Sequence, residues 1–144
     1  MTFKRILVAV DESPIAAHAA EVGSALARAL KSDVAFVHVI ASPASPPMET
    51  LVTSEQLIAE ASLEARKLLN ALAKRGSAQR ASLEFIRVGK PAAEILSSAK
   101  EWSADLIVIG SHGRSAVQRV MLGSVAESVM RQARCPVLIV RPVE

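Results

Sequence analysis

Three glycines and a serine in the last third of the chain have the types and the spacing of a phosphate-binding site. Two residues separate Gly110 from Gly113, and nine residues separate Gly113 from the pair Gly123-Ser124. Glycines at these places let the backbone turn sharply and let a ligand lie against bare N–H groups. Ser124 is expected to be the N-cap of the following helix, whose open N–H groups and dipole favour an anion. The spacing favours a phosphate cradle over ordinary turn chemistry.

A carboxylate at the end of the first apolar run is the second candidate. Asp11 directly follows the apolar run at 6–10. It could accept hydrogen bonds from ribose hydroxyls or meet a cation bound to phosphate, and the spacing does not choose between these roles. The alternative is a turn residue that starts the next helix. Because Ser13 can already cap that helix, we favour the ligand contact.

The loop between the glycines carries further polar side chains. Arg114 is a better candidate than Arg119 to reach phosphate oxygens, since a guanidinium group binds two oxygens together, although a solvated surface arginine is an equal alternative. No carboxylate lies near His112 in the sequence, so we expect its ring to make local hydrogen bonds rather than to act as an acid or base. His18 and His38 have no metal-ligand spacing, and no catalytic residue is predicted.

Two better-known nucleotide-binding motifs are missing. The turn at 11–14 contains no glycine, which excludes the dinucleotide-binding fingerprint. The segment at 110–115 is too short for a P-loop, and Arg114 stands where the lysine would be. We therefore reject a Walker-type motor.

Short apolar strands alternate with amphipathic helices along the whole chain. The expected strands are 6–10, 34–40, 83–88, 106–109 and 137–140, and the expected helices span about 14–31, 51–75, 91–102 and 124–134. This alternation predicts an α/β fold: a single doubly wound domain over 1–144, with a five-stranded parallel sheet of order 3-2-1-4-5 and helices on both faces. The order places Ala9-Val10-Asp11 opposite Gly110, at the edge where such sheets bind ligands.

Composition excludes several classes of protein. The chain has 144 residues, of which 51% are hydrophobic and 22% charged, as in a globular domain. Aromatic residues make up only 3%, and the net charge of +3 is spread along the chain, so we expect no nucleic-acid partner. The single cysteine, Cys135, is expected to be a packed structural thiol. No segment has the length of a signal peptide or membrane span, so we expect a cytoplasmic protein.

Five segments together resemble the universal stress protein family over the whole chain. They are KRILVAVDES at 4–13, VHVI at 37–40, GSHGR at 110–114, LGSVAE at 122–127 and CPVLIV at 135–140. Within that family the spacing Gly-x2-Gly-x9-Gly-Ser marks the members that bind ATP, and this chain carries it unbroken.

The resemblance implies a ligand, an ion and an assembly. It implies ATP, with adenine against backbone groups of Val39 and a divalent metal, Mg2+, held mainly by the phosphates. The implied contacts to ribose and phosphates are Ala9, Val10, Asp11, Gly110, Gly113, Gly123, Ser124 and Val125. It also implies a homodimer through the last strand, Val137–Val140, whose apolar edge would otherwise be exposed. The chain departs from many binders because Ala9 and Val10 offer no hydroxyl.

Three functions remain open at this point. The first is an ATP-binding stress-response protein, in which nucleotide orders the segments 43–50 and 111–122 and so changes the interaction with an unidentified protein partner. The second is a slow ATP hydrolase or phosphotransfer enzyme. The third is a nucleotide-free structural dimer.

Overall fold

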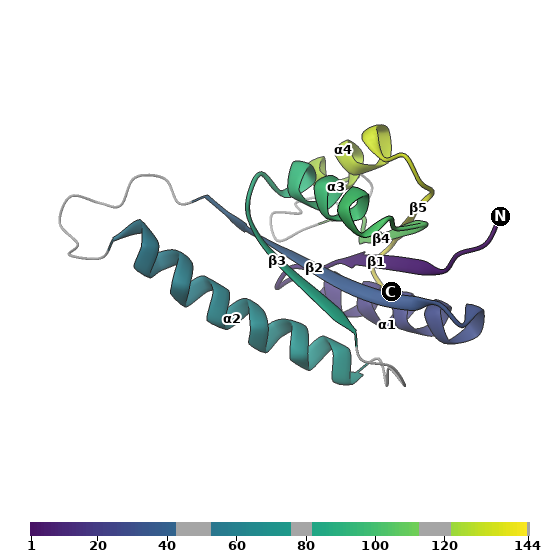
Figure 1. Cartoon of the computed structure of the whole chain (residues 1–144), viewed down its shortest axis with the longest axis horizontal. Coiled ribbons are helices and arrows are strands. Elements are labelled where there is room, and N and C mark those ends of the chain that lie inside the picture. Colours follow the sequence, from purple (N-terminus) through teal and green to yellow (C-terminus); the bar gives the residue numbers. More distant parts are fainter. Residues whose placement is uncertain (43–52, 76–81, 113–121, 144) are drawn as a thin grey trace.

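The computed structural model describes residues 1–42, 53–75, 82–112 and 122–143, in which strands and helices alternate from one end to the other (Figure 1). The strands are β1 (Arg5–Ala9), β2 (Asp33–Ala41), β3 (Leu83–Gly89), β4 (Leu106–Gly110) and β5 (Val137–Val140). The helices are α1 (Pro14–Leu30), α2 (Ser54–Arg75), α3 (Pro91–Trp102) and α4 (Ser124–Gln132).

All five strands form one parallel sheet in the order β3-β2-β1-β4-β5. The fold class and strand order predicted from the sequence are therefore confirmed. Ala9 pairs with Val37 of β2 on one side and with Ile109 of β4 on the other. The chain thus adds β2 and β3 on one side of β1 and then β4 and β5 on the other. The strand order reverses between β1 and β4, next to the carboxyl end of β1.

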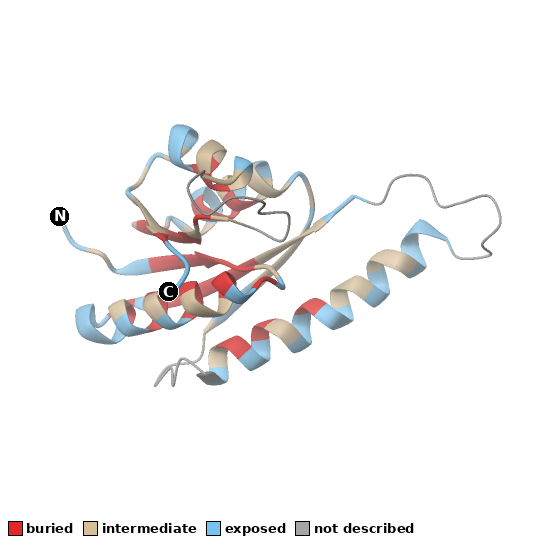
Figure 2. Cartoon of the chain, turned by 180° about the vertical axis from the view of Figure 1, so that it is seen from behind, coloured by how far each residue is buried: buried red, intermediate tan, exposed pale blue. Residues whose placement is uncertain are grey.

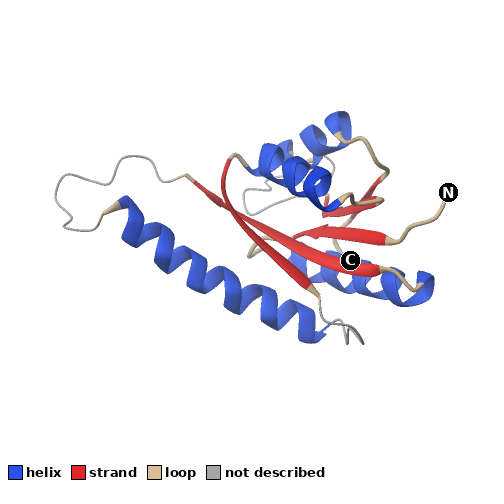
Figure 3. Ribbon diagram, in the orientation of Figure 1, coloured by secondary structure: helices blue, strands red, loops and turns tan. Residues whose placement is uncertain are grey.

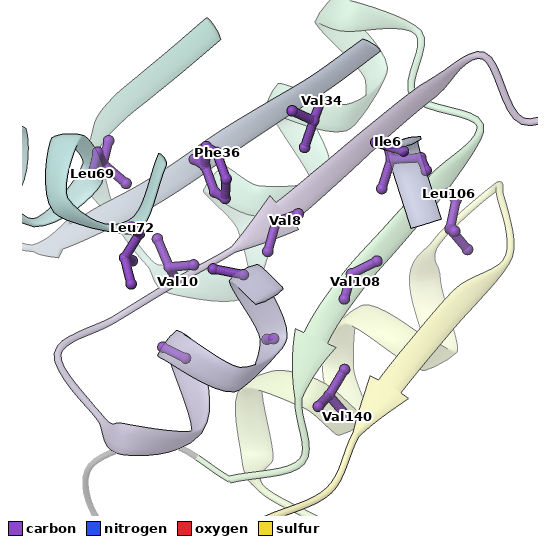
Figure 4. Close-up of a cluster of buried hydrophobic side chains, with 14 residues drawn as sticks. Ile6, Val8, Val10, Val34, Phe36, Leu69, Leu72, Leu106, Val108 and Val140 are labelled. Carbon is purple, nitrogen blue, oxygen red and sulfur yellow. The ribbon is translucent and has the colours of Figure 1, made fainter. Parts of the chain in front are cut away.

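Helices cover both faces of the sheet, α1 and α2 on one and α3 and α4 on the other (Figure 3). Strand side chains alternate between the two cores, because successive residues point to opposite faces. In β1, Ile6 and Val8 lie in the core under α1 and α2, whereas Leu7 and Ala9 lie under α3 and α4. Phe36 is fully buried in the first of these cores (Figure 4).

Helix α2 buries one stripe and leaves its outer face exposed (Figure 2). The spacing of apolar residues predicts a stripe of Leu57, Ala61, Ala65, Leu68 and Leu72. Of these, Ala65 and Leu72 are buried, whereas Leu69, which lies outside the predicted stripe, is fully buried. The helix begins at Ser54 rather than near residue 51. The Thr53 hydroxyl accepts from the Gln56 N–H group (3.2 Å) while the Gln56 side chain accepts from the Thr53 N–H group (2.9 Å), which is a capping box.

The last helix was predicted to end two residues later than it does. It ends at Gln132, and Ala133 already has extended backbone angles (φ −65°, ψ 143°). The strand bounds differ from the predicted ones by one residue at several ends. Within the described residues, none of the helices is both long and apolar enough to cross a membrane.

Asp105 fastens the amino-terminal ends of β1 and β4 together. Its Oδ2 atom accepts from the N–H groups of Lys4 (2.8 Å) and Arg5 (2.9 Å), and its own N–H group donates to the Arg5 carbonyl (2.8 Å). The Arg5 guanidinium group also donates to the Trp102 carbonyl (3.1 Å). The end of the sheet remote from the glycines is therefore held by a carboxylate.

We expect Asp105→Ala to lower the free energy of unfolding by about 1 kcal/mol, since two backbone hydrogen bonds to an exposed carboxylate are lost. Asp105→Asn is the matched control. Both bonds go to one oxygen, which the asparagine carbonyl can replace, so this variant should stay within about 0.5 kcal/mol of the wild type. Urea denaturation measures both values, and equal losses in the two variants would contradict the expectation.

Candidate functional site

The candidate site lies at the carboxyl ends of β1 and β4, where the sheet reverses its strand order. Because Ala9 pairs with Ile109, the next residues, Val10 and Gly110, stand level with each other. The predicted juxtaposition of the first strand end with the glycine segment is confirmed. Crevices at such reversal points are where open α/β sheets bind ligands.

Backbone hydrogen bonds join the two ends of the glycine signature, which consists of Gly110, Gly113, Gly123 and Ser124. The Ser111 N–H group donates to the Val140 carbonyl of β5 (2.8 Å), and the Gly123 N–H group donates to the Ser111 carbonyl (2.6 Å). The start of α4 therefore sits beside the end of β4, although twelve positions separate Ser111 from Gly123 in the chain. Gly113, Arg114 and Arg119 belong to the segment 113–121, which lies outside the described residues, as does the segment 43–52.

Gly123, not Ser124, is the N-cap of α4, so the predicted cap is wrong by one residue. Gly123 has extended backbone angles (φ −64°, ψ 154°), and Ser124 is the first helical residue. Glycine is itself an acceptable N-cap, and its bare backbone leaves the helix end accessible. The first intrahelical bond runs from the Glu127 N–H group to the Gly123 carbonyl (2.9 Å). The N–H groups of Ser124 and Val125 precede it, at the open end of the helix.

The charge near this helix end is balanced locally. Glu127 stands in the first turn of α4, where a carboxylate would compete with a bound anion. However, its Oε1 atom accepts from both Nε (3.1 Å) and an Nη nitrogen (2.9 Å) of Arg131 one turn later. The carboxylate is thereby directed along the helix, which leaves the end available to phosphate.

Gly110 has a packing role that the sequence did not reveal. A Cβ atom at this position would stand 3.0 Å from Cγ2 of Ile15, in the first turn of α1. That distance is tighter than an ordinary contact, so the missing side chain lets α1 approach β4. Gly110 therefore brings the start of α1 to the candidate site, besides any contact that it makes with a ligand.

Asp11, not the side chain of Ser13, accepts the hydrogen bonds at the start of α1. Ser13 is the N-cap of α1 by its position, but its side chain makes no capping bond. Instead Oδ1 of Asp11 accepts from the Ser13 N–H group (2.8 Å) and from the Ser13 hydroxyl. The premise that Ser13 caps the helix with its side chain is therefore wrong, and Asp11 does organise the turn. This arrangement fixes the orientation of the carboxylate, and its ligand contact stays a prediction.

His112 makes the local hydrogen bond expected of it and leaves one nitrogen unsatisfied. Its Nδ1 atom lies 2.8 Å from the hydroxyl of Ser111, which is itself buried. Its Nε2 atom is buried and has no hydrogen-bond partner in the described part of the chain. A buried polar atom without a partner is costly, and a phosphate oxygen would satisfy a ring N–H group there. The site therefore fits an anionic ligand.

Val39 and His38 extend the site to the second strand. The Val10 N–H group donates to the Val37 carbonyl (2.9 Å), so the polar backbone groups of Val37 face β1. Residues alternate along a strand, so those of Val39 face the same way, beyond the point where the β1–β2 pairing ends. His38, which the sequence left without a role, reaches across so that its Nδ1 atom lies 2.9 Å from the Val10 carbonyl.

In the described part of the chain, no cluster of metal-ligating side chains lies beside the site. Across 1–42, 53–75, 82–112 and 122–143, no three His, Cys, Asp or Glu side chains gather where they could hold a metal ion. Cys135 lies outside the site, and burial is the main cause that raises the pKa of its thiol. A raised pKa keeps the thiol protonated and unreactive at neutral pH, which agrees with the structural role expected of it.

The chain is similar to known proteins both in sequence and in structure. Residues 2–141 match the universal stress protein family. Universal stress protein YxiE of Bacillus subtilis is 33% identical and is covered over 99% of its length by 96% of this chain. The fold resembles that of universal stress protein UspA from Lactobacillus plantarum (TM-score 0.86, 24% identity, 98% and 99% of the two chains covered).

Two further solved structures contain nucleotides. One is a universal stress protein in complex with cAMP (TM-score 0.73, 25% identity, 99% of this chain and 100% of the other covered). The other is a universal stress protein from Archaeoglobus fulgidus in complex with dAMP (TM-score 0.65, 27% identity, 98% and 100% covered). The match over nearly the whole length of the chain leads to one conclusion: this protein belongs to the universal stress protein family.

Proposed function

We propose that this chain is an ATP-binding regulatory protein whose nucleotide-dependent conformation, rather than rapid catalysis, carries its function. The observation that carries the proposal is the meeting of the β1 end, the Val39 backbone and the two ends of the glycine signature at one edge of the sheet. The cAMP and dAMP complexes of two relatives support an adenine nucleotide as the ligand. The proposed contacts are Ala9, Val10, Asp11, Val39, Gly110, Gly113, Arg114, Gly123, Ser124 and Val125.

The backbone of Val39 is suited to the adenine base. An N–H donor and a carbonyl acceptor on the same side of one strand residue match the ring-nitrogen acceptor and the amino donor along one edge of adenine. Guanine carries an oxygen acceptor and a ring N–H donor on the equivalent edge, so its pattern is reversed. We therefore assign the specificity for adenine to Val39.

The phosphates belong at the glycine side of the site in this proposal. The open N–H groups at the start of α4 and the unsatisfied nitrogen of His112 offer donors to phosphate oxygens. Oδ1 of Asp11 is committed to Ser13, so we assign Oδ2 to a ribose hydroxyl or to a Mg2+ ion on the phosphates. The ion would be held chiefly by the nucleotide and water.

Assembly is the second part of the proposal. In the described sheet β5 is an edge strand that pairs only with β4, and its four residues are all apolar. An exposed apolar edge with unpaired backbone groups favours pairing with another chain, and a two-fold axis makes that contact self-complementary. We propose a homodimer through Val137–Val140. We also propose a further protein partner whose binding depends on whether nucleotide is bound.

Calorimetric titration of nucleotide-free protein with ATP and magnesium tests the nucleotide. We expect binding with a Kd in the micromolar range, no comparable heat with GTP, and a loss of at least about tenfold in Gly123→Val, because a β-branched side chain would cover the helix end. Parallel titrations with cAMP and dAMP identify the preferred phosphate chain. Thermal unfolding of Gly123→Val without nucleotide separates loss of the site from loss of the fold.

The outcomes of this titration distinguish the alternatives. Equal affinity in the wild type and in a folded Gly123→Val variant would remove the helix end from the site. No heat with any adenine nucleotide would overturn the proposal and leave the structural dimer as the better description.

A further inference from the structure

We propose that His38 is a positioning residue, which keeps the Val39 N–H group open to a ligand by occupying the carbonyl that this group would otherwise bind. The inference rests on the nucleotide site proposed above and adds to it a side chain that lies outside the predicted contacts. Its basis is the hydrogen-bond pattern at the end of β1, which is independent of any ligand.

If the regular pairing of β1 with β2 continued, it would use the backbone N–H group of Val39. In a parallel pair, the N–H group of a residue donates to a carbonyl of the neighbouring strand. Its own carbonyl accepts from the N–H group that lies two residues after that carbonyl. The Val10 N–H group donates to the Val37 carbonyl (2.9 Å), so the next bond of the pattern would run from the Val39 N–H group to the Val10 carbonyl. Among the described residues that bond is absent, and the pairing of the two strands ends at Ala9 and Val37.

The imidazole of His38 takes the place of that bond. Its Nδ1 atom lies 2.9 Å from the Val10 carbonyl oxygen. A carbonyl only accepts, so Nδ1 must carry the hydrogen, which fixes the ring tautomer. His38 is half-buried and projects to the same face as Phe36, from which its ring reaches the neighbouring strand. The Val10 carbonyl is thus satisfied by a side chain, and the Val39 N–H group is left for the base.

Amide hydrogen exchange of the nucleotide-free protein, measured by NMR, tests this directly. In the wild type we expect the Val39 amide to exchange at least about tenfold faster than the Val37 amide, which lies within the paired region. His38→Phe keeps a ring of similar shape but removes the donor, so the strands should pair one bond further and the Val39 amide should become protected. In His38→Asn the side-chain amide nitrogen takes the place of Nδ1, so exchange should resemble that of the wild type.

Nucleotide titration of the same proteins gives the second readout. We expect His38→Phe to weaken ATP binding by about fivefold or more, and His38→Asn to bind nearly as well as the wild type. A Val39 amide as protected as that of Val37 in the wild type, or identical exchange in the two variants, would overturn the role of His38. If the exchange results hold but no variant binds nucleotide, the proposed function fails while the strand-end role of His38 stands.

Discussion

The substitution Gly23→Ala in α1 is expected to destabilise the protein by about 1–2 kcal/mol, although alanine is the better helix former. A Cβ atom at position 23 would lie 2.5 Å from Cγ2 of Val8 in β1, well inside any contact that real side chains make. Helix propensity favours alanine by about 1 kcal/mol, whereas overpacking a filled core costs about 1–3 kcal/mol or more. Val8 is fully buried and β-branched, so it cannot rotate away. The clash therefore outweighs the propensity.

Urea denaturation of a double-mutant cycle measures this effect. Val8→Ala removes the methyl group that the new Cβ would meet, so Gly23→Ala should cost nothing, or even stabilise, in that background. The coupling energy between the two positions should be at least about 1.5 kcal/mol in favour of the double variant. A Gly23→Ala single variant as stable as the wild type would mean that α1 can move away from the sheet without cost.

The sequence predicted the fold because the strands are nearly continuous apolar runs. Buried parallel strands carry apolar side chains on both faces, so a segment such as Leu106–Gly110 stands out without knowledge of its neighbours. Strand order followed from the alternation with helices and from the rules of connection. What could not be predicted is contact between elements: nothing in the sequence shows that Gly23 meets Val8, or that Leu69 is buried more completely than Leu68.

The sequence predicted that the end of β1 meets the glycine segment and that His112 makes a local hydrogen bond, but it missed the other hydrogen bonds there. Asp11 and Ser13 are both small polar residues that favour turns, and which of the two side chains accepts the hydrogen bonds of the turn depends on side-chain rotation, which a sequence does not encode. Gly123 and Ser124 are both acceptable N-caps, so the cap could shift by one residue. His38 was passed over because its partner is 28 residues away, and only the strand register brings the two together.

Replacement of His112 by phenylalanine is expected to weaken ATP binding by about tenfold or more and to leave adenosine binding unchanged, because a hydrogen bond from a ring nitrogen to a charged phosphate is worth about 1.5–3 kcal/mol. The unsatisfied Nε2 atom of His112 is the basis of this expectation, and the bond between Nδ1 and Ser111 orients the ring. When the Ser111 hydroxyl donates to Nδ1, the hydrogen of the neutral ring is on Nε2, which is then a buried donor. Adenosine lacks phosphates and cannot use it.

A second measurement distinguishes a ligand contact from a general disturbance of the loop. His112→Phe removes the unpartnered Nε2 atom, which should not lower stability, but it also removes Nδ1, the partner of the Ser111 hydroxyl. Nucleotide-free His112→Phe should therefore unfold within about 1–2 kcal/mol of the wild type. Ser111→Ala is the companion variant: it keeps the imidazole but releases its orientation, so its ATP affinity should fall by less than that of His112→Phe. Equal losses for ATP and adenosine in His112→Phe would show that the ring supports the site as a whole and does not face the phosphates.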